Sequence, residues 1–65
     1  MGDAIRATRN EVGISQEALA DAAGINRTHM GEVERGKRNV SLLAIARIAQ
    51  ALGRTPSELL AAAGL

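Results

Sequence analysis

Residues 15–36 constrain the fold of this chain more than any other segment, because they combine two short amphipathic patterns with a turn signal between them. The first pattern follows Ser15, and Gly24 ends it where a left-handed backbone would disfavour a side chain. Ala20 is small where the two helices must approach each other. These residues predict two helices packed at a fixed angle across a tight turn. The positions expected to point inward are Leu19, Ala20, Ala23, Ile25, Met30 and Val33.

Such an arrangement is typical of a helix-turn-helix, which holds its second helix at a fixed angle for insertion into the major groove of DNA. The simpler alternative is a pair of packed helices that do not bind DNA. The spacing, the turn and the small residues all favour the helix-turn-helix. We therefore predict that residues 15–36 read DNA.

The whole chain repeats one scheme, in which a polar cap precedes an amphipathic run and a glycine follows it. The scheme predicts an all-α, compact five-helix bundle in a single domain over residues 1–65. Residues 55–58 give the strongest start signal, a capping box with proline at the first helical position. The predicted helices run from about Asp3 to Val12, from after Ser15 to before Gly24, from after Asn26 to before Gly36, from after Ser41 to Gly53, and from after Thr55 to Gly64.

The first and fourth helices carry clear inward patterns. In the first helix we expect Ile5 and Val12 to point inward. The fourth helix is expected to be the most buried, because apolar residues recur along it at helical spacing. These residues are Leu42, Ile45, Ile48, Ala49 and Leu52.

Composition narrows the possible partners. The chain has no aromatic residue, whereas proteins that bind single strands or RNA loops stack bases on aromatic side chains. Double-stranded DNA is the nucleic acid that remains. The absence of cysteine excludes a disulfide framework and a zinc finger. Because the formal net charge is only +1, DNA binding must depend on where the charges lie.

Other classes of protein are disfavoured. The apolar stretches are far shorter than the ~20 residues of a membrane span, and no signal-peptide pattern begins at Met1, so we expect a cytoplasmic protein without membrane contact. The sequence contains no metal-ligand cluster, nucleophile–base pattern or phosphate-binding glycine loop. We therefore expect no cofactor, no metal site and no enzymatic activity, and no site for a small-molecule effector is visible.

Motifs along nearly the whole chain resemble the Cro/C1-type (Xre) helix-turn-helix family, which includes phage repressors, restriction-modification controller proteins and antitoxins. Val40 and Arg54 depart from the family pattern, which commonly has a proline and an apolar residue at these positions near the ends of the fourth helix. The resemblance is carried by Arg9, Ser15-Gln16-Glu17-Ala18-Leu19-Ala20, Gly24, Glu34-Arg35-Gly36, Ile48-Ala49, Leu52-Gly53 and Pro56-Ser57-Glu58-Leu59-Leu60.

The resemblance implies a lambda-repressor-like domain, usually dimeric, that binds inverted or repeated operator half-sites in bacterial or phage DNA. It also implies a structural ion pair between Arg9 and Glu34 that ties the first helix to the third.

Three residues on the predicted recognition helix are candidate base readers: Arg27, Thr28 and Glu32. Arg27 can donate to guanine O6 and N7 together, and the alternative is contact with phosphate alone. Thr28 can offer its hydroxyl group, or its methyl group to thymine. Glu32 can accept from a cytosine amine or serve only to exclude wrong sequences.

A second group is expected to contact the phosphate or sugar backbone and so to position the protein. For Asn26 the alternative is a simple helix cap, and for His29 it is a solvated helix residue. Gly31 is unusual inside a helix, and close approach to DNA or to the preceding helix would both explain its small size. The backbone-contact group consists of Gln16, Asn26, His29, Arg35, Lys37, Arg38 and Asn39.

One five-helix unit reads only a few base pairs, whereas a two-fold dimer reads half-sites ~34 Å apart. We therefore expect a homodimer with Leu43, Leu60 and Leu65 at its interface, and closure of the core is the alternative for Leu60.

These features predict a sequence-specific transcription regulator that represses by occupying promoter DNA, with activation as a further possibility. The alternatives are an antitoxin or a protein-bridging module on the same fold. The basic residues that follow the recognition helix favour DNA.

Overall fold

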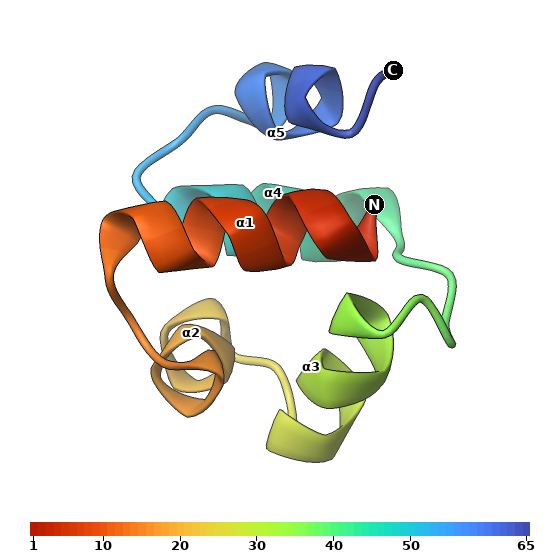
Figure 1. The fold of residues 1–65 in the computed structure, drawn as a ribbon. Coiled ribbons are helices and arrows are strands. Elements are labelled where there is room, and N and C mark those ends of the chain that lie inside the picture. Colours follow the sequence, from red (N-terminus) through yellow and green to blue (C-terminus); the bar gives the residue numbers. More distant parts are fainter.

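The computed structural model describes residues 1–65 and contains five α-helices and no strand. They are α1 (Gly2–Val12), α2 (Gln16–Ala23), α3 (Arg27–Glu34), α4 (Leu42–Ala51) and α5 (Pro56–Ala62). In the view of Figure 1, α1 and α4 cross the middle of the molecule, with α2 and α3 below them and α5 above. The predicted five-helix architecture is confirmed. None of the helices is long and apolar enough to cross a membrane.

Capping residues explain why the helices begin where they do. The Ser15 hydroxyl accepts a hydrogen bond from a backbone N–H in the first turn of α2. At α5 the cap is reciprocal, because the Glu58 carboxylate accepts from the Thr55 N–H at 2.9 Å and the Thr55 hydroxyl accepts from the Glu58 N–H at 3.1 Å. Each cap satisfies an N–H group that a helix leaves without an internal partner. The predicted capping box is confirmed.

Small side chains let the helices of the core pack closely. Ala20 on α2 and Ala49 on α4 are both fully buried, as is Met30 on α3. Aliphatic residues and alanines fill the space that aromatic rings occupy in many cores, and this explains how a short chain without aromatics encloses its interior. The core consists of Ile5, Leu19, Ala20, Ala23, Met30, Val33, Ile45, Ile48, Ala49, Leu52 and Leu59.

Two inward positions were predicted wrongly. Val12 is 38% exposed and Leu42 is 75% exposed. Ile25 is half-buried and packs against the core, as predicted. Val12 lies in the last turn of α1 and Leu42 in the first turn of α4. Helical side chains lean toward the N-terminus of their helix, so Leu42 leans past the end of the bundle although it follows the spacing of the buried face. End residues of a periodic pattern therefore have few neighbours to cover them.

The fourth helix is not the most buried one. In α3, the residues Met30, Gly31, Val33 and Glu34 are buried, against Ile45, Ile48 and Ala49 in the longer α4. Although α4 contacts two helices, α2 and α5, its first turn is exposed at Leu42 and Leu43.

Gly2 permits a close contact that the sequence pattern did not reveal. A β-carbon at Gly2 would lie 2.5 Å from the Val33 carbonyl oxygen and 2.6 Å from that of Glu34. Real side chains do not approach backbone atoms so closely. The first turn of α1 can rest against the end of α3 only because residue 2 has no side chain.

A buried ion pair also joins these two helices. Arg9 of α1 donates from Nε to Glu34 Oε2 at 2.9 Å and from Nη2 to Glu34 Oε1 at 3.1 Å. A third donor of Arg9, Nη1, reaches the Ile14 carbonyl oxygen at 3.1 Å. The side chain of Glu34 is 2% exposed and that of Arg9 is 14% exposed. This two-point contact fixes the end of α3 against α1.

Candidate nucleic-acid interface

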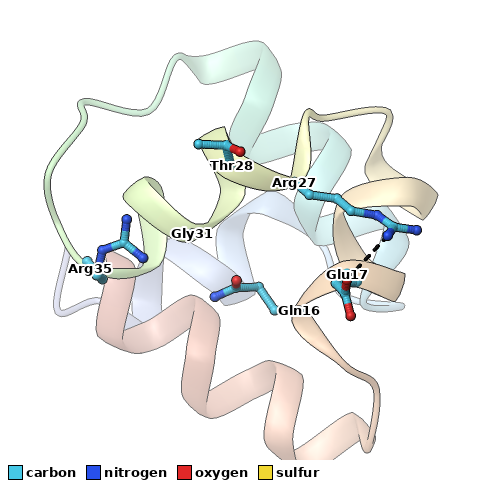
Figure 2. Close-up of a pocket in the computed structure, with 6 residues that line it drawn as sticks. All are labelled: Gln16, Glu17, Arg27, Thr28, Gly31 and Arg35. Carbon is cyan, nitrogen blue, oxygen red and sulfur yellow. Dashed lines mark hydrogen bonds and ion pairs between the residues drawn. The ribbon is translucent and has the colours of Figure 1, made fainter.

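The candidate interface is a polar surface where α2 and α3 begin. Gly24 ends α2 with a φ of 67°, and the short turn that follows leads directly into α3. A shallow hollow opens there between the two helices, and no apolar side chain lines it (Figure 2). Its lining consists of Gln16, Glu17, Arg27, Thr28, Gly31 and Arg35. Such a surface offers hydrogen-bonding groups to a polar partner and little to an apolar ligand.

Asn26 caps α3. Its carboxamide oxygen accepts from the Thr28 N–H at 2.8 Å and from the His29 N–H at 3.2 Å. The amide NH₂ group of Asn26 donates no hydrogen bond within the chain and is the part that remains for a phosphate. Capping and backbone contact are therefore compatible roles for this residue.

Arg27, the first residue of α3, lies against α2. Its Nε and Nη2 atoms donate to the two carboxylate oxygens of Asp21 at 3.2 and 2.8 Å, and Nη1 donates to Glu17 Oε2 at 3.2 Å. The hydrogen bond from Arg27 lowers the pKa of Asp21 below its ordinary value, and the same bond raises the pKa of Arg27. All three side chains stay more than half exposed.

Gly31 lies at the bottom of the hollow and is buried. A β-carbon there would lie 3.2 Å from Arg35 Nη1 and 3.4 Å from Gln16 Oε1. The small size of Gly31 therefore leaves room for two polar side chains, one from α2 and one from the end of α3. Arg35 shares the hollow with Arg27 and Thr28, as Figure 2 shows, so its guanidinium lies on the same face as two predicted base readers.

The remaining predicted DNA contacts lie outside this hollow. Glu32 is paired with Arg38, with 3.2 Å between Glu32 Oε1 and Arg38 Nε. His29 is half-buried on another side of α3, where it lines a separate hollow with Leu43 and other residues. Lys37, Arg38 and Asn39 are exposed in the connection between α3 and α4. The structure thus brings Gln16, Arg27, Thr28 and Arg35 together and places Glu32 and His29 apart from them.

Two functional candidates escaped the sequence analysis, namely Glu17 and Asp21, the partners of Arg27. The signal was present, because these acids are four residues apart on α2 and so share one helix face. What the sequence did not supply was the direction in which the Arg27 side chain extends.

The leucines predicted for a dimer interface differ in exposure. Leu43 is 60% exposed and Leu65 is 83% exposed, whereas Leu60 is half-buried and packs against the core. Leu42, predicted as core, is exposed beside Leu43. Leu65 lines a hollow of apolar and polar residues, which include Val40 and Arg38.

Together, a five-helix bundle and a helix that exposes a polar face beside a tight turn define a DNA-binding domain of the helix-turn-helix class. A helix-turn-helix family model (HTH_3) matches residues 5–59. The control protein C.SmaI of Serratia marcescens is 40% identical over 65 residues, which cover 100% of this chain and 77% of that protein.

Two solved structures are similar. The restriction-modification controller protein C.AhdI from Aeromonas hydrophila superposes with a TM-score of 0.86 and 48% identity, covering 89% of this chain and 88% of that one. The clp gene regulator ClgR from C. glutamicum gives a TM-score of 0.89 and 34% identity, covering 97% of this chain and 83% of that one. This chain belongs to the Cro/C1-type helix-turn-helix family of DNA-binding transcription regulators.

Proposed function

We propose that this chain binds an operator of inverted or repeated half-sites as a homodimer and represses transcription by occupying promoter DNA. The observation that carries the proposal is the polar hollow between α2 and α3, where Arg27, Thr28 and Arg35 lie on one exposed face. In this arrangement α3 lies in the major groove with its first turn closest to the bases, and these three side chains face base edges. No catalytic step is part of the proposal.

Groups that contact the DNA backbone lie on either side of the proposed base readers. The N-termini of α2 and α3 offer backbone N–H groups, and Gln16 and Asn26 add side-chain amides at the same ends. Lys37, Arg38 and Asn39 add two basic side chains and an amide beyond the end of α3. These groups position the protein on phosphates and carry little sequence information. The revised set of base readers is Arg27, Thr28 and Arg35, and Glu32 excludes wrong sequences from its place beside Arg38.

The regulated genes are proposed to be those of a restriction-modification system. The relative that matches across this entire chain is named a control protein, and the similar solved structure of C.AhdI is named a restriction-modification controller. The match to ClgR, a clp gene regulator, supports the regulator fold without supporting this choice of genes.

Dimerisation is proposed through the exposed leucines at the start of α4 and the end of the chain. Leu42, Leu43 and Leu65 expose large apolar side chains that a second copy would cover. Leu60 adds to this surface from the edge of the core. A dimer doubles the number of base pairs read, which a single short recognition helix needs for useful specificity.

The proposal is tested by measuring affinity for a labelled mixture of random duplexes over a salt series, by fluorescence anisotropy. The protein is expected to bind duplex DNA, and a Lys37→Ala/Arg38→Ala variant is expected to bind more weakly with a salt slope smaller by about two. The matched control is Arg47→Ala/Arg54→Ala, which removes two charges from outside α3 and its basic extension. Folded protein that binds no duplex at low salt would overturn the proposal and favour a protein-bridging module.

A further inference from the structure

The donors of Arg27 are only partly used in the free protein. A guanidinium carries five N–H donors, and three of them are paired, two with Asp21 and one with Glu17. The Nε and Nη2 edge is occupied by Asp21 in a two-point contact. Nη1 and Nη2 each keep one N–H without a partner. These two donors are as many as a bidentate contact with guanine O6 and N7 requires.

The two acids also fix where the guanidinium lies. Asp21 and Glu17 are one helical turn apart on α2, and Arg27 donates three hydrogen bonds to them, so its side chain is held against the preceding helix. An arginine without such partners distributes over many rotamers and loses that freedom on binding. A guanidinium that is already held in one place loses less side-chain entropy when it binds DNA.

The net charge of Arg27, Asp21 and Glu17 together favours guanine over phosphate as an acceptor. One arginine and two carboxylates give a net charge of −1. A phosphate that approaches Arg27 therefore meets two exposed carboxylates and is repelled, whereas a neutral guanine accepts hydrogen bonds without that penalty. An aspartate is charged at neutral pH already, and the hydrogen bond from Arg27 lowers the pKa of Asp21 further.

We propose that Glu17 and Asp21 form an acidic clamp that positions Arg27 for guanine and denies it to phosphate, so that these residues of α2 set the sequence selectivity of a contact made by α3. The proposal rests on the proposed function, because it requires Arg27 to meet a base. Glu17 and Asp21 are positioning residues and touch no base themselves.

The first test measures base preference. Wild-type protein and the variants Asp21→Ala, Arg27→Ala and Asp21→Ala/Arg27→Ala each select duplexes from a random library, and the bound fraction is sequenced. Wild type is expected to prefer guanine at one position of each half-site, and Arg27→Ala is expected to lose that preference. Asp21→Ala is expected to weaken the same preference about three- to tenfold, and adding it to Arg27→Ala is expected to change nothing further.

The clamp also predicts a change in affinity for duplex DNA of random sequence. This affinity is expected to rise in the variant whose guanine preference weakens. Freed from Asp21, Arg27 can bind phosphate, so Asp21→Ala is expected to bind random duplex about threefold more tightly with a salt slope steeper by about one. Glu11→Ala is the matched control, because it removes one exposed carboxylate near Arg54, a partner that takes no part in the site. This control is expected to leave the guanine preference unchanged.

Two results of these DNA-binding experiments would overturn the clamp. The first is a guanine preference that stays intact in Asp21→Ala. The second is a change caused by Asp21→Ala that persists without Arg27, because simple repulsion of DNA would then explain it. Either result leaves the proposed function standing if the wild type still selects a motif. A wild type that selects no motif overturns both proposals.

A measurement on the free protein tests the clamp without DNA. In nitrogen-edited NMR spectra the Arg27 Nε–H is expected to give a resolved, slowly exchanging signal that shifts or broadens in Asp21→Ala. The Arg9 Nε–H, bonded to buried Glu34, serves as the internal reference and is expected to stay unchanged. An Arg27 signal identical in wild type and variant would contradict the clamp.

Discussion

At the scale of single residues, the ion pair of Arg9 and Glu34 makes the sharpest claim about stability. Glu34 is 2% exposed, so Arg9→Ala leaves a buried carboxylate without its counter-ion. We expect a loss of about 3 kcal/mol in the free energy of unfolding, measured by urea denaturation. Arg6→Ala, which removes an exposed arginine paired with Asp3, is expected to lose less than about 1 kcal/mol. Equal midpoints for the two variants would reject the structural role of the pair.

Gly2 supports a second prediction at this scale. Gly2→Ala places a β-carbon within 2.6 Å of two backbone oxygens of α3, and backbone cannot rotate away as a side chain can. We expect this variant to lose about 1 to 3 kcal/mol, although alanine is the better helix former. Asp3→Ala, at the exposed neighbouring position, serves as control. A Gly2→Ala protein as stable as wild type would show that α1 and α3 can move apart at little cost.

The sequence predicts the place of some side chains at the candidate site and not of others. Thr28 and Gln16 were assigned to the DNA-facing surface from their positions at helix starts, and both line the polar hollow. Arg35 was placed with the backbone contacts, yet it shares the hollow with the base readers. The place of Arg35 depends on the direction in which its side chain extends. For a long, flexible arginine the sequence does not specify that direction. The same reason hid the contact of Arg27 with Asp21.

At the scale of the elements, the capping box of α5 predicts a dependence of stability on pH. The hydrogen bond from the Thr55 backbone N–H, followed by that from the Thr55 hydroxyl, lowers the pKa of Glu58 in the folded state below its ordinary value. A carboxylate with a lowered pKa stabilises the fold above its unfolded pKa, and this contribution is lost as the pH falls through the folded pKa.

Glu58→Ala is therefore expected to be less stable than wild type near pH 7, with a difference that shrinks toward about pH 3. Urea denaturation at both pH values measures it. Glu11→Ala is the control, since Glu11 accepts no capping hydrogen bond. A difference for Glu58→Ala that is the same at both pH values would mean that the charge of Glu58 contributes nothing to the cap.

Helix existence and helix starts were predictable because they depend on local chemistry. Ser15, Asn26, Ser41 and Thr55 each cap the helix that the sequence assigned to them. Burial at helix ends was not predictable from periodicity, because it depends on which neighbours cover the last turn. Leu42 shows this, since it follows the spacing of the buried face of α4 and is nevertheless 75% exposed.

At the scale of the whole molecule, the proposed dimer rests on apolar side chains that the single chain leaves uncovered. Leu43→Glu is expected to shift sedimentation velocity toward the monomer and to leave that monomer folded, because Leu43 is 60% exposed in one chain. Gln50→Glu, which adds the same charge to an exposed position farther along α4, is expected to stay dimeric. A wild-type protein that remains monomeric at high concentration, with and without DNA, would reject this interface.

Operator binding by a dimer is tested most directly by selecting bound fragments from a random duplex library with the wild-type protein at near-physiological salt and sequencing them. We predict an enriched inverted repeat whose half-site centres lie about 34 Å apart, one turn of the DNA helix, because a two-fold dimer presents two copies of α3 to one face of the duplex. A folded protein that enriches no motif would contradict the account.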